Sequence, residues 1–89
     1  MISAIMVAAN TYEVIVEGEV ETIHTVTLSA DYHRQLCGGT LTHEWVLIQS
    51  FKFLLEHEPN TAILQAFDLQ DIDRFYPDFE NEIRRRLGQ

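Results

Sequence analysis

The segment HTVTLSADYHRQLCGGTLTHEWVLIQSFKFLLEHEP, residues 24–59, decides the fold of this chain. Its first residues alternate between β-branched and polar side chains, which favours a strand. Ser29 or Asp31 can cap a short helix that follows. Gly38 and Gly39 end that helix near Cys37, because glycine readily adopts the left-handed conformation found at helix ends. The predicted order is a strand, a short helix and a turn.

A longer helix is predicted over residues 42–57. Thr42 supplies its cap, and Pro59 ends it because the residue before a proline avoids helical backbone. At 100° per residue the helix has two apolar strips on roughly opposite sides. One contains Leu47, Ile48, Phe51, Leu54 and Leu55, and the other contains Val46 and Phe53. Such a helix is either sandwiched inside the domain or shared with a second copy, so a homodimer through residues 42–57 is one expectation.

The N-terminal third favours strands. Residues 12–17 alternate as a half-buried strand does, and EGEV can turn the chain into a second strand over residues 20–28, with Gly18 supplying a positive φ. Residues 2–9 are apolar enough to add another strand. In the second strand Ile23 lies on the face opposite to Val20, His24, Val26 and Leu28, which predicts either a bulge or a second covered face.

The last third is predicted to be helical with interruptions. Asn60 or Thr61 opens a helical turn through AILQAF, residues 62–67, and Asp68 opens another that reaches about Tyr76. Pro77 then starts the final helix. That helix has a narrow apolar stripe at every fourth residue, made of Phe79, Ile83 and Leu87.

These elements predict an α+β fold, with an N-terminal antiparallel hairpin or small sheet packed against three to four helices. The chain has 89 residues, of which 46% are apolar, and this length suits a single domain over residues 1–89. The only cysteine, Cys37, cannot form an intramolecular disulfide, so a reducing cytoplasm is expected. The apolar start of the chain is too short to span a bilayer, and no membrane association is expected.

Charge argues against polyanionic partners. Fourteen acidic residues face six Lys and Arg, for a formal net charge of -8, so nucleic acid is an unlikely partner. The only basic cluster, Arg84 to Arg86, follows acidic residues on the same predicted helix. Favourable i, i+4 pairs are predicted between Glu80 and Arg84 and between Glu82 and Arg86. We therefore interpret the arginines as compensated by their own helix.

A DNA-binding alternative comes from a partial resemblance. In its order of elements, the stretch from IHTVTLS to the end of the long helix resembles the ribbon-helix-helix repressors, whose dimeric strands lie in the major groove. That resemblance implies base-reading roles for Thr25 and Thr27, with His24 beside them. The first helix is shorter than in that family, and no Lys or Arg flanks the strand to contact phosphates.

No residue pattern predicts catalysis, a cofactor or a bound metal. His33 and Cys37 have helical spacing for a zinc ion, with His43 or Asp31 as further ligands, but two such residues arise easily by chance. His43, Ser50 and His57 are about 10.5 Å apart along a helix, too far for a nucleophile and its base, and form instead a wet seam between the apolar strips. Pairs such as Asp71 and Asp73 are interpreted as exposed carboxylates. The chain is predicted not to be an enzyme.

The chain also resembles a family of short bacterial proteins of unknown function. The resemblance is carried by EGEVETIHTVTLS, by the GG pair, by FLLEHEP and by the ILQAFDLQDIDRFYPDFENEI tail, and it covers about four-fifths of the sequence. It implies a bacterial source and no activity or ligand. It also implies fold roles as turns, caps and core for Gly38, Gly39, Pro59, Phe67, Asp68, Leu69, Ile72 and Phe75.

The sequence thus predicts a small acidic cytoplasmic accessory or protein-interaction domain without catalytic activity. Its expected partner is another protein or a second copy of the chain. The alternative is a small dimeric transcriptional regulator or an antitoxin-like DNA-binding protein.

Overall fold

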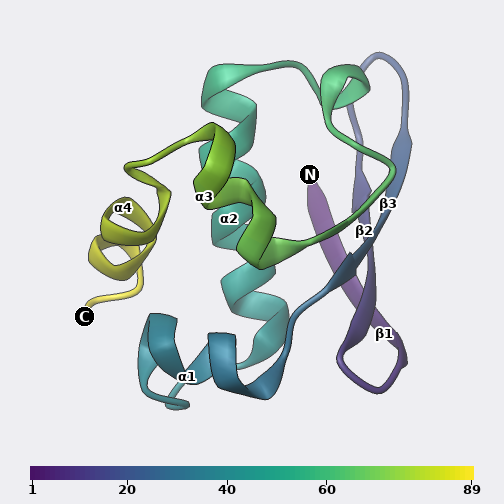
Figure 1. The fold of residues 1–89 in the computed structure, drawn as a ribbon. Coiled ribbons are helices and arrows are strands. Elements are labelled where there is room, and N and C mark those ends of the chain that lie inside the picture. Colours follow the sequence, from purple (N-terminus) through teal and green to yellow (C-terminus); the bar gives the residue numbers. More distant parts are fainter.

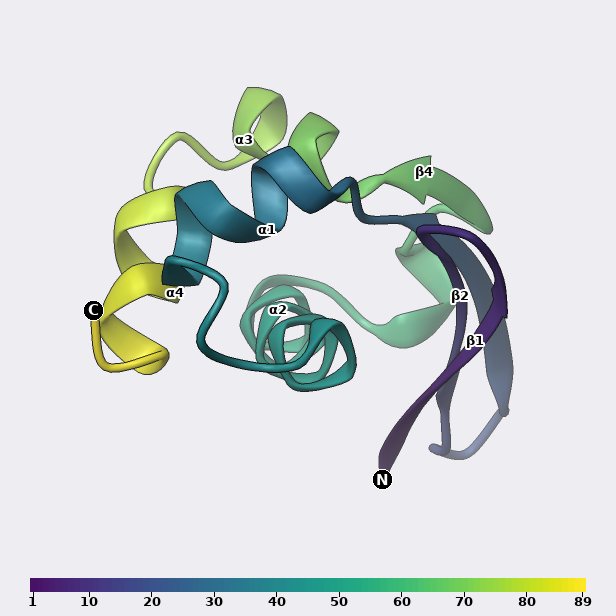
Figure 2. The same ribbon diagram turned by 90° about the horizontal axis from the view of Figure 1, so that it is seen from below.

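The computed structural model describes residues 1–89 as a two-layer α+β fold, with a sheet on one side and the helices on the other (Figures 1 and 2). This confirms the predicted fold class. The strands are β1 (Ile2–Ala8), β2 (Thr11–Val16), β3 (Thr22–Thr27) and β4 (Ala66–Asp68). The helices are α1 (Ala30–Cys37), α2 (His43–His57), α3 (Ile72–Phe75) and α4 (Phe79–Arg86), with 3-10 turns η1 (Asn60–Ala62) and η2 (Leu69–Asp71).

The sheet has the order β1-β2-β3-β4, in which β1, β2 and β3 are antiparallel neighbours and β4 runs parallel to β3. The prediction of a strand in residues 2–9 is confirmed. The predicted role of Gly18 is wrong, because its φ is not positive and residues 17–21 form a longer loop. The positive φ lies instead at Asn10 (57°), in the tight turn between β1 and β2, since asparagine tolerates that conformation.

The sequence predicts either a bulge or a second covered face in β3, because Ile23 lies on the face opposite to the other apolar residues. Neither is present in the structure. The β2–β3 register is regular from Thr11↔Thr27 to Val16↔Thr22, without a bulge. His24 and Val26 face the core, and Ile23 is 50% exposed on the outer face, which no helix covers. Val20 lies before the strand and is also exposed. The mixed pattern therefore reflects an apolar residue left on an open sheet face.

The prediction of a helical turn in residues 62–67 is wrong. The chain leaves η1 in extended conformation and forms β4, which pairs with β3 from Thr25↔Ala66 to Thr27↔Asp68. Thr25 donates its N–H to the carbonyl oxygen of Gln65 at 2.7 Å. The second edge of β3 thus supplies backbone partners for this short segment. Local sequence cannot reveal a strand that depends on a neighbour 40 residues away.

Helix α2 lies inside the domain, and both of its apolar strips are covered by the chain itself. On one side Phe51 is fully buried against His24 of β3 and Phe67 of β4, with ring centroids 5.3 and 6.0 Å away. On the other side Phe53 packs edge-on against Phe79 of α4 at 5.4 Å. Of the two arrangements predicted for this helix, sandwiched inside the domain or shared with a second copy, the sandwiched one is observed.

The helix ends follow the predicted signals closely. The Ser29 and Thr42 side chains accept hydrogen bonds from the N–H groups of Tyr32 and Trp45, as expected of N-caps. Gly38 ends α1 in the left-handed conformation, with φ 66°. The last helix begins at Phe79, two residues later than Pro77 predicts.

Of the fold positions implied by the family resemblance, Phe75 is not a core residue. Leu69 and Ile72 are buried, and Asp68 caps η2 by accepting a hydrogen bond from the N–H of Gln70. Phe75 is instead 68% exposed. Within α3, Ile72 is the buried residue, and Phe75, at the last position of the helix, lies at the surface.

Replacing Phe51 with alanine should lower the free energy of unfolding by about 3 to 5 kcal/mol, because it leaves a cavity between α2 and the sheet. The measurement is urea denaturation followed by circular dichroism. Lys52→Ala is the matched control on the next, exposed position. A loss for Phe51→Ala no larger than that of the control would contradict the placement of α2.

Candidate binding groove

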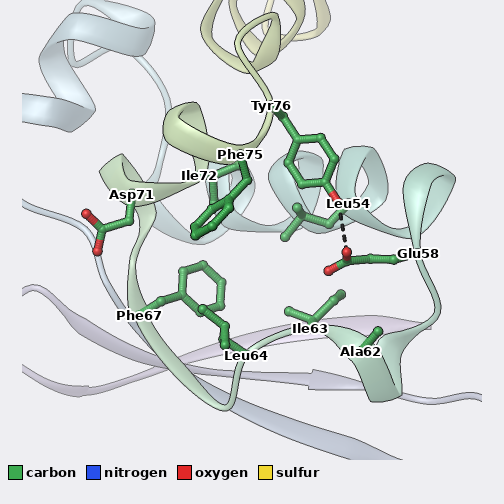
Figure 3. Close-up of a pocket in the computed structure, with 10 residues that line it drawn as sticks. All are labelled: Leu54, Glu58, Ala62, Ile63, Leu64, Phe67, Asp71, Ile72, Phe75 and Tyr76. Carbon is green, nitrogen blue, oxygen red and sulfur yellow. Dashed lines mark hydrogen bonds between the residues drawn. The ribbon is translucent and has the colours of Figure 1, made fainter.

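An apolar hollow lies where the end of α2, the segment from η1 to β4, and α3 come together (Figure 3). Its volume is about 310 Å³, and eight of its ten lining residues are hydrophobic. The lining consists of Leu54, Glu58, Ala62, Ile63, Leu64, Phe67, Asp71, Ile72, Phe75 and Tyr76. We call this feature the apolar groove. Its composition is that of a site for an apolar side chain or small ligand.

The floor of the groove is fixed by core packing. Leu54 and Ile63 are buried, and Phe67 packs on the ring of Phe51. Leu64 and Phe75 stand on the rim and are 59% and 68% exposed. The groove is thus a rigid apolar floor with two large apolar side chains open to solvent, an arrangement that marks interaction surfaces.

One carboxylate lies within the apolar lining. Glu58, the C-cap residue of α2, accepts a hydrogen bond of 2.7 Å from the hydroxyl of Tyr76 (Figure 3). This bond, together with partial burial, raises the pKa of Tyr76 above its ordinary value. The other acid of the lining, Asp71, points away from the groove and pairs with Arg74 at 3.6 Å. Glu58 therefore gives the groove one negatively charged end.

Two polar hollows adjoin the apolar groove, and both are acidic. One shares Phe75 and Tyr76 with the groove and carries three acids, Glu56, Asp78 and Glu82, against one arginine, Arg86. The other shares Asp71 and carries four acids, Asp68, Asp71, Asp73 and Glu80, against Arg74. An apolar ligand flanked by positive charge would match this surface.

Every arginine of the chain is paired with a carboxylate. Arg84 lies 3.9 Å from Glu80, and Arg86 lies 2.9 Å from Glu82, which confirms both predicted i, i+4 pairs. Arg86 also reaches Glu56 of α2 at 2.7 Å. The remaining pairs are Arg34 with Asp31, Arg74 with Asp71, and Arg85 with Glu82. Lys52, the only lysine, is in no ion pair and lies 6.0 Å from the centroid of the Trp45 ring.

The residues implied as base readers lie in different environments. His24 is buried, and its Nδ1 donates to the carbonyl oxygen of Leu64 at 2.7 Å, so it holds the groove segment against β3. Thr25 and Thr27 point to the opposite side of β3. Both edges of β3 are occupied, by β2 and by β4, so β3 has no edge free to pair with a second copy.

The candidate zinc ligands are partly brought together. The ring centroids of His33 and His43 are 4.0 Å apart, and the Cys37 sulfur lies 3.4 Å from Nε2 of His33. That nitrogen donates a hydrogen bond of 2.6 Å to the carbonyl oxygen of Leu41, so it carries a proton and is not free to bind metal. Asp31 is exposed and pairs with Arg34. No three His, Cys, Asp or Glu side chains are placed to share a metal ion.

The predicted wet seam along α2 is wrong at its centre. Ser50 is fully buried, and its hydroxyl donates to the carbonyl oxygen of Val46 at 2.8 Å. His43 stacks on His33 near one end of the helix, and His57 lies at the other end beside Tyr76. These three side chains do not meet. Asp71 and Asp73, interpreted as exposed carboxylates, are half-buried and line the acidic hollow beside the groove.

Sequence reasoning missed the apolar groove because two of its walls come from the segment interpreted as a helical turn. The sequence around Leu64 and Phe75 gave no clear signal, because Leu64 follows the apolar Ile63 and Phe75 precedes the aromatic Tyr76. The fold and groove define a two-layer α+β domain with an open-faced sheet and one apolar hollow.

Comparison with protein-family models, with curated proteins and with solved structures found no match. None of the helices has the length and apolar character needed to cross a membrane.

The half-buried position of His43 predicts a pH dependence of stability. Burial, and then the neighbouring His33, lower the pKa of His43 below its ordinary value of 6.5, so the folded state binds its proton less readily than the unfolded state. The contribution of His43 to stability is therefore present above about pH 6.5 and is lost as the pH falls below it. Melting temperatures measured from pH 7 to pH 5 should fall less steeply for His43→Gln than for the native chain. His57→Gln, an exposed change on the same helix, should keep the native slope; equal slopes for all three would contradict this prediction.

Arg86 should contribute more to stability than its neighbour Arg85. The Arg86 side chain is 19% exposed, bridges α4 to Glu56 of α2 and covers the ring of Phe53, with 5.6 Å between the guanidinium carbon and the centroid. Arg86→Ala should lower the free energy of unfolding by about 1 kcal/mol, through the lost pairing and packing. Arg85→Ala, which removes only an exposed pair within α4, should leave the urea midpoint unchanged. Equal effects of the two changes would show that the bridge to α2 adds nothing.

Proposed function

We propose that this chain is a small, non-catalytic protein-interaction domain that uses its apolar groove to hold a segment of a partner protein. The observation that carries the proposal is the exposure of Leu64 and Phe75 over a buried apolar floor, with Glu58 at one end. A bound partner would cover these two large apolar side chains, which lie side by side with the apolar floor.

The chemistry around the apolar groove favours a basic partner. The two adjoining hollows hold seven different acids, of which Asp68, Asp73 and Asp78 are in no ion pair, and the chain as a whole carries a net charge of -8. The matching segment is one in which a large apolar residue is flanked by Lys or Arg. The apolar residue would enter the groove, and the flanking cations would lie over the acidic hollows and near Glu58.

The proposal also includes where the protein works, which is the cytoplasm of a bacterial cell. A single buried thiol, Cys37, suits a reducing cytoplasm, and the resemblance to short bacterial proteins suggests a bacterial cell. A homodimer through α2 has less support, because the two apolar strips that suggested it are both covered within one chain. DNA binding has no supporting observation of its own, since the arginines are paired and both edges of β3 are occupied.

Selection from a random peptide library against the immobilised chain tests the proposal. The enriched peptides should combine Leu, Phe or another large apolar residue with adjacent Lys or Arg. Their binding should weaken by about tenfold or more for Leu64→Ala and for Phe75→Ala, and salt should weaken it further. Both positions are exposed, so these variants should fold normally.

Ile23→Ala is the matched control, because Ile23 is a comparably exposed apolar residue on the outer face of the sheet, away from the groove. Peptides that bind this variant as they bind the native chain would place the site in the groove. Enrichment of acidic peptides, or binding unaffected by Leu64→Ala, would refute the proposal. A gel shift on random duplex DNA at low salt tests the alternative function.

A further inference from the structure

Strand β1 forms one edge of the sheet and is hydrogen-bonded to β2 alone (Figure 2). In an antiparallel pair, residues alternately direct their backbone groups toward and away from the neighbouring strand. Met1 and Glu17 form a hydrogen-bonded pair, with Glu17 donating its N–H to the carbonyl oxygen of Met1 at 2.9 Å. The pairs Ser3↔Ile15 and Ile5↔Glu13 follow at every second residue.

Ile2, Ala4 and Met6 therefore direct their N–H and C=O groups to the free edge. Three residues with one donor and one acceptor each present six backbone groups to solvent. The regular ladder ends beyond Met6, where the register shifts between Met6 and Ala8. The free edge is thus a short, regular row with Ala4 at its centre.

The side chains of β1 leave this edge open to pairing. Its sequence ISAIMVA contains no charged residue and no proline, the features that most often block edge-to-edge association. Ile5, Met6 and Val7 are 52%, 60% and 52% exposed. The first acidic residue of the chain is Glu13, so this uncharged edge is unusual in a chain with fourteen acids.

We propose that the β1 edge pairs with the β1 edge of a second copy, antiparallel about a two-fold axis at Ala4. In this register Ala4 lies opposite Ala4 of the second copy, and Ile2 lies opposite Met6. Each such pair exchanges two hydrogen bonds, so the three pairs use all the free groups of both edges. The result is one continuous sheet of eight strands.

A second copy fits this edge for two reasons. The free groups at positions 2, 4 and 6 are symmetric about position 4, as an isologous interface requires. The residue on the axis is alanine, whose small side chain causes no clash, and Met6 gains cover from Ile2 of the other copy. Like charges do not meet across the contact, even though each copy is strongly acidic. The β1 edge is separate from the apolar groove, so either proposal can fail without the other.

Sedimentation equilibrium of the native chain and of Ala4→Pro tests the dimer. The Ala4 N–H is not used inside the chain, so proline on this edge strand should not disturb the fold. It removes a central donor from each copy and should weaken dimerisation by about 10- to 100-fold. A native chain that stays monomeric up to about 1 mM would overturn the proposal.

A charge placed on the edge gives a second variant. Met6→Lys puts an ammonium group at the pairing edge of both copies and should yield a monomer with the native circular dichroism spectrum. Ile23→Lys puts the same charge on a similarly exposed isoleucine away from that edge and should remain a dimer. A folded Met6→Lys that dimerises like Ile23→Lys would place the interface elsewhere.

Amide hydrogen exchange distinguishes this interface from a dimer through α2 and from pairing of β1 with another strand. As the protein concentration rises, the amides of Ile2, Ala4 and Met6 should become protected together, whereas those of Ser3 and Ile5 are protected throughout. A dimer whose formation leaves the first three amides unprotected, or species that grow beyond a dimer, would refute the two-fold pairing at Ala4.

Discussion

Helix α2 carries large apolar side chains on two opposite sides, and both sides must be withdrawn from water. Phe51 requires a surface on one side, which the sheet supplies, and Phe53 requires another, which α4 supplies. Arg86 joins the same two helices by reaching Glu56 across the ring of Phe53. The two-layer fold is in this sense organised around one helix. An amphipathic helix with a single apolar side would not need the C-terminal helices to return across it.

The way in which the chain covers α2 produces β4 and the apolar groove, and it leaves the outer face of the sheet uncovered. After Pro59 the chain must cross back to the sheet, and it does so by adding β4 to the second edge of β3. The buried His24 ties this return to the sheet through the carbonyl oxygen of Leu64. Between the returning segment, α3 and the end of α2, the apolar groove remains. The outer face of the sheet and the edge of β1 stay uncovered, because every helix is used on the other face.

The distribution of charge separates the two proposed surfaces. The arginines pair with carboxylates of their own or neighbouring helices. The net negative charge therefore comes from the carboxylates that have no such partner, among them Asp68 and Asp73 in one hollow beside the groove. The β1 edge carries no charge at all. The two proposed partners, a basic segment and a second copy of the chain, would therefore bind different parts of the surface, and a dimer through β1 would leave both grooves open.

Local sequence determined the elements whose signals lie within a few residues. The ends of α1 and α2 are set by caps and backbone restrictions at Ser29, Gly38, Thr42 and Pro59. The two apolar strips of α2 predicted that both sides of this helix would be covered. The acids and arginines of α4 also paired as their spacing predicted. Only the tertiary structure decided that residues 66–68 form a strand, that Ile23 and Phe75 stay exposed, and that Leu54, Ile63 and Phe67 enclose a groove. Each of these outcomes depends on contacts between segments far apart in the chain, whose free energy exceeds the local preference of a three- or four-residue segment.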